Sequence, residues 1–252
     1  MTMIPKMFKR TGAPLALAMA AAFSAQASEA PEDLADLVDA GMTIYARECA
    51  ACHGDEGDGE GPGAYILSQK PRNLQLAVFK IRSTPSGEYP TDHDLFETIT
   101  NGLQGANGAM MPSFRSLSER DRWALVAAVK DIALIDEPGQ AIELPAKPAI
   151  NLALGRDVYD RLQCASCHGD DGEGDGPSSL TLKDDQKRRT WAPDLTIGLY
   201  KGGGEPEDIY LRIVTGMEGS PMPSYAGKAS EDELWALTDF VLSLAQPQQD
   251  SE

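Results

Sequence analysis

The chain has 252 residues, of which 42% are hydrophobic and 24% charged, a composition typical of a globular protein with one large or two small domains. It has 39 acidic and 22 basic residues and a formal charge of −17. This excess of acid argues against nucleic-acid binding, because phosphate contacts need clustered lysine and arginine side chains. An acidic surface suits a protein partner with a cationic docking face.

Residues 1–27 have the pattern of a secretory signal. Lys6, Lys9 and Arg10 precede an apolar run over 13–23, and Ala25-Gln26-Ala27 gives an A-x-A cleavage pattern. The apolar run is too short for a membrane helix, which needs about 20 residues, although an uncleaved anchor is the alternative. We therefore predict a soluble protein exported to a Gram-negative periplasm, able to associate with a membrane complex. Removing three cations and no acids gives the mature chain a charge of −20.

The first copy of a repeated pattern follows this segment. A short amphipathic helix is expected over Leu34–Glu48, and it leads into the motif Cys49-Ala50-Ala51-Cys52-His53. Further along, Ser118 is a good N-cap for a helix with Leu125, Val129 and Ile132 on one stripe.

Asp136–Ile150 contains three prolines and no strong periodicity, which predicts an extended linker. The predicted organisation is a signal segment over 1–27, a first domain over 28–135, a linker over 136–150 and a second domain over 151–252.

The second domain repeats the first. A helix is expected over Leu152–Leu162, then Cys164-Ala165-Ser166-Cys167-His168, then a helix with a capping box at Ser230. Besides the cysteine motifs, five features of the first half recur in the second in the same order. Gly41-x-x-x-Tyr45 corresponds to Gly155-x-x-x-Tyr159, and the Gly-rich stretch 53–62 corresponds to 168–177. In the same way, Asp94-Leu95-Phe96 corresponds to Asp208-Ile209-Tyr210, Met111-Pro112-Ser113-Phe114 to Met222-Pro223-Ser224-Tyr225, and Trp123-Ala124-Leu125 to Trp235-Ala236-Leu237. So long a period indicates tandem domains. No segment shows convincing strand alternation.

Cys-x-x-Cys-His is the attachment signature of c-type haem. Two thiols one helical turn apart suit the two vinyl groups on adjacent pyrroles, and the histidine that follows can bind the iron. Three other readings are weighed: a disulfide within each motif, a thioredoxin-like redox motif, which expects a preceding strand, and a zinc site, which needs four ligands at compact spacing. Two identical motifs inside matching repeats favour two haem c groups.

The sixth iron ligand distinguishes an electron carrier from a catalyst. Met111 and Met222 lie at matched positions in Met-Pro-Ser-aromatic loops, so we expect His53/Met111 and His168/Met222 ligation. Met110 is the rival to Met111, Met217 is interpreted as packing, and His93 as a surface residue.

The sequence also offers weaker candidates for groups that would contact the haems or their histidine ligands. A carbonyl in the loop at Pro62 or Pro177 is a candidate acceptor for the histidine N–H. Candidate donors to the haem propionates, chosen by chain position alone, are Arg72, Arg82, Trp191 and Lys201. A basic cluster, whose role is left open between propionates, a partner and solvent, comprises Lys183, Lys187, Arg188 and Arg189.

With these motifs, each half resembles a class I cytochrome c, and the whole chain is similar in architecture to the dihaem cytochrome c4 group. The resemblance covers nearly all of residues 31–246. It implies an all-α fold of two tandem cytochrome c domains, each wrapped around one covalently bound haem. Cys49, Cys52, His53 and Met111 would hold the first haem, and Cys164, Cys167, His168 and Met222 the second. The stretch Phe79–Asp94 is longer than expected for a compact c4-type half and looks more like cytochrome subunits that serve periplasmic oxidoreductases.

We therefore expect an electron-transfer protein, not an enzyme, that moves single electrons between redox protein partners of a respiratory chain or a periplasmic oxidoreductase. The main alternative is a dihaem redox enzyme or the cytochrome subunit of a periplasmic dehydrogenase or reductase complex. A dihaem enzyme needs an open sixth position, and its two haems are commonly unlike, whereas these halves are alike. A third hypothesis is an exported binding module with two disulfides and no haem.

Overall fold

The computed structural model describes residues 29–105 and 111–245. The predicted signal segment and Met110 lie outside these residues. Across the described ranges, the regular structure is helical, and β-pairing is limited to isolated bridges at Leu103–Met111 and Lys183–Arg189. The all-α prediction is confirmed.

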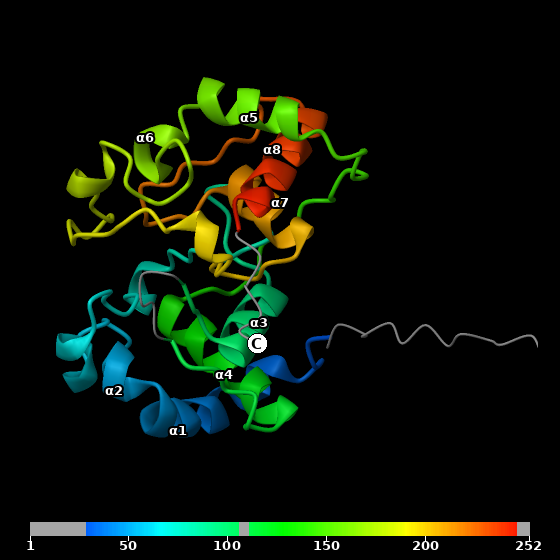
Figure 1. Cartoon of the computed structure of the whole chain (residues 1–252). Helices are drawn as coiled ribbons and strands as arrows, with labels where there is room; N and C mark the ends of the chain where they lie inside the picture. Colours follow the sequence, from blue (N-terminus) through cyan, green and yellow to red (C-terminus); the bar gives the residue numbers. More distant parts are fainter. Residues whose placement is uncertain (1–28, 106–110, 246–252) are drawn as a thin grey trace, which may run out of the picture.

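The chain forms two halves that lie one above the other in Figure 1. The α-helices of the first half are α1 (Val38–Glu48), α2 (Ala50–His53), α3 (Asp92–Asn101) and α4 (Glu119–Ala133). Those of the second are α5 (Leu152–Arg161), α6 (Ala165–His168), α7 (Pro206–Thr215) and α8 (Glu231–Leu244). Short 3-10 turns are η1 (Leu34–Leu37), η2 (Pro62–Ile66), η3 (Leu74–Leu76), η4 (Ser179–Thr181) and η5 (Leu195–Ile197).

The core of each half has the same plan. Helix α1 packs on α4 and α3 packs on α4, while in the second half α5 and α7 both pack on α8. An aromatic pair lies between the last two helices: Phe96 and Trp123 stack at a centroid distance of 4.2 Å, and Tyr210 and Trp235 also at 4.2 Å. These rings and the aliphatic residues around them form a separate hydrophobic cluster in each half.

The repeated glycines explain how closely the first and last helices approach. A Cβ on Gly41 would lie 1.9 Å from the Ala124 carbonyl oxygen of α4, and one on Gly155 would lie 2.1 Å from that of Ala236 in α8. Only a residue without a side chain allows this crossing. The pairing of the Gly-x-x-x-Tyr and Trp-Ala-Leu motifs is therefore a packing device.

The helix starts predicted from capping residues are confirmed. Ser118 caps α4 through the backbone N–H of Asp121, and Ser230 forms a capping box with Glu233 at the start of α8. The first predicted helix, over 34–48, begins as the 3-10 turn η1 before it becomes α1. Residues 136–151 contain no helix. Among the described residues, no helix combines the length and apolar character needed to cross a bilayer.

Candidate haem sites

The two cysteine motifs sit on the short helices α2 and α6, each placed directly after the first long helix of its half. The end of each short helix is fixed by a buried tyrosine from that long helix. Tyr45 Oη donates to the Gly54 carbonyl at 2.9 Å, and Tyr159 Oη donates to the Gly169 carbonyl at 2.6 Å. Because the same hydrogen bond occurs in both halves, both Cys-x-x-Cys-His units have the same support.

The histidine of each motif is buried and oriented by a backbone carbonyl. His53 Nδ1 lies 3.0 Å from the carbonyl oxygen of Arg72, and His168 Nδ1 lies 3.4 Å from that of Pro193. When Nδ1–H donates to the carbonyl, Nε2 keeps its lone pair for a metal. Burial lowers the pKa of both imidazoles below the usual value, which favours the neutral form that binds metals.

The expectation that a carbonyl near Pro62 or Pro177 accepts this hydrogen bond is wrong. The Gly-Pro segments pack against the cysteine helices instead: a Cβ on Gly61 would lie 2.5 Å from the Ala50 carbonyl oxygen, and one on Gly176 would lie 2.3 Å from that of Ala165. The accepting carbonyls come from a more distant segment, 19 and 25 residues after their histidines.

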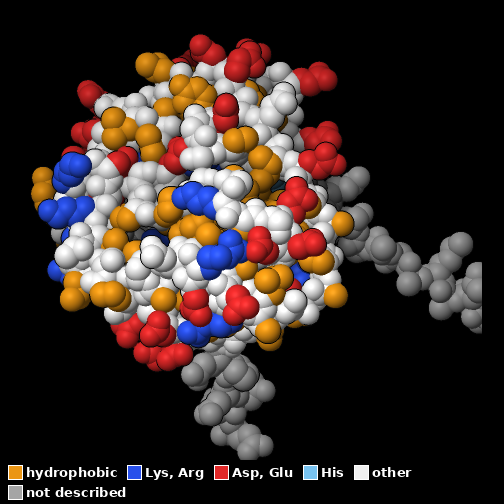
Figure 2. Space-filling view, turned by 90° about the horizontal axis from the view of Figure 1, so that it is seen from above, with side chains coloured by type: hydrophobic (Ala, Val, Ile, Leu, Met, Phe, Trp, Pro, Cys, Tyr) orange, Lys and Arg blue, Asp and Glu red, His pale blue; other side chains and the backbone are white. Residues whose placement is uncertain are grey.

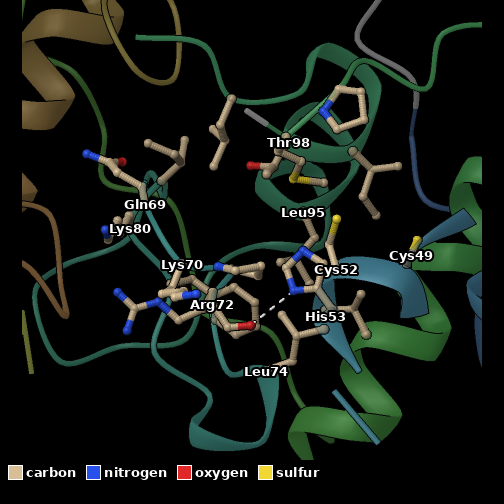
Figure 3. A pocket seen from close by; sticks show the side chains of 18 of the residues that line it. Cys49, Cys52, His53, Gln69, Lys70, Arg72, Leu74, Lys80, Leu95 and Thr98 are labelled. Carbon is tan, nitrogen blue, oxygen red and sulfur yellow. Dashed lines mark hydrogen bonds between the residues drawn. The ribbon is translucent and has the colours of Figure 1, made fainter. Parts of the chain in front are cut away.

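A large apolar cavity opens beside α2. Its empty volume is about 1500 Å³, including the part open to solvent. Its wall includes Cys49, Cys52, His53 and Met111. Figure 3 shows His53 with its dashed hydrogen bond to Arg72, between the cysteines on one side and Gln69 and Lys80 on the other. Apolar neighbours from α3, α4, the turn η3 and the segment after it also line the cavity, namely Leu74, Phe79, Leu95, Ile99, Leu125 and Val129. The size, the apolar wall and the donor set fit a porphyrin bound through two thioethers and one imidazole.

The Met-Pro loops are tied to the helix that precedes them. Ser113 Oγ donates to the Thr100 carbonyl at 2.7 Å, and Ser224 Oγ donates to the Val214 carbonyl at 2.6 Å. Met111 lines the cavity together with His53. The repeated Met-Pro-Ser triplet thus combines a thioether with its own anchor.

Met217 lies in the second of these loops. Its backbone N–H donates to the Met222 carbonyl at 3.1 Å, as that of Leu103 donates to the Met111 carbonyl at 2.9 Å. Leucine stands at the matching place in the first half, which agrees with the interpretation of Met217 as packing.

All four cysteine thiols of the chain are unpaired, so neither motif forms a disulfide. Burial raises the pKa of Cys49 and of Cys164 to about 11 each. Within the described ranges, no cluster of three or more histidine, cysteine or acidic side chains could hold a metal ion such as zinc.

The propionate candidates have different surroundings. Arg82 is fully buried between the halves and pairs with Glu218 at 3.1 Å, so it does not face a haem cavity. The Arg72 side chain pairs with Asp185 at 3.0 Å. Trp191 lies under the guanidinium of Arg189, in a second, more polar pocket.

The two remaining candidates, Lys201 and His93, lie at different places relative to this cavity. Lys201, from the second half, lines the cavity of the first. His93 lies in the first turn of α3 and stacks on Phe96 with ring centroids 6.5 Å apart, and it is not one of the residues that line this cavity.

Comparison with known proteins places both halves in one family. The family model described as "Cytochrome C oxidase, cbb3-type, subunit III" matches residues 36–127 and again residues 151–241. The double match confirms two tandem cytochrome c domains and, with them, a dihaem c-type cytochrome.

Two curated relatives are cbb3-type cytochrome c oxidase subunits. CcoP of Helicobacter pylori (strain 52) is 26% identical over 215 residues, which cover 83% of this chain and 59% of that protein. FixPc of Rhizobium leguminosarum bv. viciae is 28% identical over 205 residues, which cover 81% of this chain and 60% of that protein. The chain thus spans about three fifths of the length of these relatives.

A solved structure is also similar. A chain of the Kuenenia stuttgartiensis reducing HAO-like protein complex Kustc0457/Kustc0458 superposes with a TM-score of 0.80 at 37% identity, covering 87% of this chain and 100% of that one.

Proposed function

Because the chain belongs to the cbb3-type cytochrome c oxidase subunit III family, we propose that it passes single electrons between redox proteins through two haem c groups. The observation that carries this proposal is the repeated constellation of two cysteines, a carbonyl-oriented histidine and an anchored Met-Pro loop. Cys49, Cys52, His53 and Met111 hold the first haem in this proposal. Cys164, Cys167, His168 and Met222 hold the second.

The bound haem supplies an iron that alternates between ferric and ferrous states. The chain's own residues limit the structural rearrangement that accompanies this change of oxidation state. The carbonyl of Arg72 fixes the ring of His53, and Ser113 ties the Met111 loop to α3. The apolar wall of the cavity limits water near the metal, which favours the less charged ferrous state. A thioether ligand acts in the same direction.

The same constellation favours a carrier over a catalyst. A catalytic haem needs a free or displaceable position for its substrate, whereas each half here offers a methionine anchored at the matched place. The named relatives are subunits of oxidases, and the solved homologue is part of a complex. We propose the same kind of role here: an electron-transfer subunit or carrier that serves a larger oxidoreductase.

Substitution of the methionines tests the proposal. Met111→Ala and Met222→Ala should each abolish the low-spin His/Met spectrum of one haem and leave the other intact. Met217→Ala is the matched control, because it removes a thioether from the same loop as Met222 and should leave both haems unchanged. If neither substitution alters the ferric spectrum, including its sulfur-to-iron charge-transfer band, the ligand assignment is wrong.

Ligand binding separates the carrier from the dihaem enzyme. The purified protein should bind neither carbon monoxide nor peroxide as isolated. Each methionine variant should gain carbon monoxide binding at one haem. Binding by the unaltered protein would favour an enzyme.

We also propose a periplasmic location and a partner with a cationic docking face. The formal charge of −17 supports the latter. On the face seen in Figure 2, acidic side chains form several groups around the margin, while basic ones gather in fewer places. Electrostatic steering predicts that the rate of electron exchange with such a partner falls as salt rises. A rate independent of ionic strength would contradict a cationic partner.

A further inference from the structure

The cavity beside α2 is not built by the first half alone. Asp184, Gln186 and Lys201 of the second half line it together with the cysteine motif of the first. A second pocket shares part of the same wall, including Gln69 and Lys80. The interface between the halves therefore forms one edge of the first cavity.

Two lysines at this edge occupy equivalent positions in the repeat. Asn73 is the N-cap of η3 in the first half, and Asp194 is the N-cap of η5 in the second; each cap side chain accepts a hydrogen bond from a backbone N–H of its turn. Each of the two lysines lies seven residues after its cap. Lys80 and Lys201 follow these turns, and both line the first cavity. The duplication thus brings two ammonium groups to one place.

Neither ammonium forms an ion pair with any carboxylate in the described part of the chain. Other cations at the interface do: Arg72 pairs with Asp185, Arg82 with Glu218, and Arg188 with Glu60. Lys201 Nζ donates to the side-chain oxygen of Gln69 at 2.7 Å.

Two acids, Glu48 and Asp184, share the cavity wall, and each already has other partners. Glu48 pairs with Arg47 at 2.7 Å. Asp184 Oδ1 accepts from the backbone N–H groups of Gln186 and Arg188, at 3.0 and 2.8 Å. The chain has 39 acids for 22 basic residues, so two partly buried lysines without an ion pair are unexpected.

The environment penalises the charge on both lysines. Burial, with a smaller contribution from the neighbouring Lys80, lowers the pKa of Lys201 to about 8. Burial also lowers the pKa of Lys80, with Arg72 acting in the same direction and the carboxylates of Asp184 and Asp185 opposing the shift without reversing it. An anion between these groups would remove the penalty.

The opposite side of the cavity carries the thiols. Figure 3 shows Lys80 and Gln69 across the cavity from Cys49 and Cys52, with His53 between them. In a porphyrin of this type the two vinyl groups and the two propionates lie on opposite sides of the ring. A haem fixed to the cysteines therefore has its carboxylates on the side of the lysines.

We propose that Lys80 and Lys201 bind the propionates of the first haem, so that the second half supplies a cation to the haem site of the first. This inference rests on the proposed function. Lys201 is then a positioning and charge-balancing residue for a cofactor that its own half does not hold. A cation at this place favours the ferrous state, because reduction removes one positive charge from the iron.

Lys201→Gln tests this in the haem-loaded protein by potentiometric titration. The ferrous/ferric equilibrium of one haem should shift toward ferric by about threefold to tenfold, and tenfold is about 59 mV for one electron. The other haem should not change. The affected haem is identified in a Met222→Ala background, where the second haem has a distinct spectrum. Lys201→Arg should restore the original potential.

Lys183→Gln is the matched control, because Lys183 is exposed, lies in the second half and lines neither pocket. If Lys201→Gln shifts neither haem more than this control, or shifts only the second, the inference is overturned. If Lys201→Gln does not fold, Lys80→Gln provides an independent test, because it should shift the equilibrium of the same haem toward ferric.

Titrations with and without inorganic phosphate distinguish the propionates from a free anion. A shift that depends on phosphate would overturn the inference. Failure of the proposed function itself is recognised separately, since the unaltered protein would then lack two haems with His/Met spectra.

Discussion

The two halves share the hydrogen bonds that support the cysteine motifs and the Met-Pro loops, and they differ where they meet. The tyrosine, histidine and serine hydrogen bonds recur in both. By contrast, the first half has 13 residues between Lys80 and Asp94, where the second has 6 between Lys201 and Asp208. The second half has 16 residues between Pro177 and Asp194, where the first has 10 between Pro62 and Asn73.

Both longer segments build the interface. From the first-half segment, Arg82 donates to the Thr215 carbonyl at 2.9 Å, and Arg212 of α7 donates to the Arg82 carbonyl at 2.6 Å. From the second-half segment, Asp185 pairs with Arg72 and Arg188 with Glu60. The segments that differ in length thus join the halves, whereas the residues common to both lie at the candidate haem sites. The basic cluster of the second half thus serves the interface at least through Arg188.

Removal of one thiol pair gives the largest expected effect. Cys49→Ala with Cys52→Ala, and separately Cys164→Ala with Cys167→Ala, should each lower the intact mass by one haem in addition to the lost sulfurs. Mass spectrometry of the denatured protein measures this directly, because only covalent haem remains. If either double variant lost both haems, the halves would not be independent attachment units.

Arg82 is the next most sensitive site. Arg82→Met removes the ion pair with Glu218 and the guanidinium hydrogen bonds to three carbonyls, of which only that of Pro85 keeps a backbone donor among the hydrogen bonds of the described residues. It should lower the free energy of unfolding by about 3 kcal/mol, at the low end for a broken buried pair because Glu218 is partly exposed and keeps hydrogen bonds from Ser86 and Gly87. Urea unfolding should also become less cooperative between the halves. Arg120→Met is the control, since its pair with Asp33 is exposed to solvent and should contribute little to stability.

This interface marks the limit of what the sequence predicts. The cysteine motifs, the capping serines and the Met-Pro loops each have a local signal, and the structure places them at matched positions. Arg82 has no such signal: its burial depends on Glu218, 136 residues away. Its assignment to a propionate from chain position therefore fails. The carbonyls of Arg72 and Pro193 were missed for the same reason, although their matched positions just before the caps Asn73 and Asp194 could have pointed to them.

The glycines at the helix crossings test how alike the halves are. Gly41→Ala and Gly155→Ala place a methyl group against a backbone carbonyl, and each should lower the free energy of unfolding by about 1–3 kcal/mol. Gly204→Ala is the control, because its Cβ would meet nothing nearer than 3.7 Å. Thermal unfolding of the haem-loaded variants measures the effect. A large loss at only one crossing would show that the two halves tolerate the crossing differently.

The serine anchors should give smaller and unequal losses. Ser113→Ala and Ser224→Ala each remove one hydroxyl-to-carbonyl hydrogen bond, an interaction that contributes about 0.5–1.5 kcal/mol. Ser224 is partly buried and Ser113 is exposed, so the loss should be larger in the second half. The sulfur-to-iron band of the affected haem should weaken as its loop loosens. Equal losses would mean that burial of these anchors is unimportant.

The smallest expected effect concerns the cap of α8. The side chain of Glu233 accepts from the Ser230 backbone N–H at 2.8 Å, which lowers its pKa, with Arg161 adding to the effect. Since the folded pKa lies below the unfolded value, the carboxylate stabilises the fold above the unfolded pKa and loses this contribution as pH falls through the folded one. Glu233→Gln should therefore be less stable than the unaltered protein near neutral pH and equal to it in acid. The first half has Asp121 at this place, and in the described chain only the Ser118 hydroxyl caps α4. Asp121→Asn should accordingly lower the stability near neutral pH less than Glu233→Gln does, and an equal or larger loss would contradict the assigned role of the capping box.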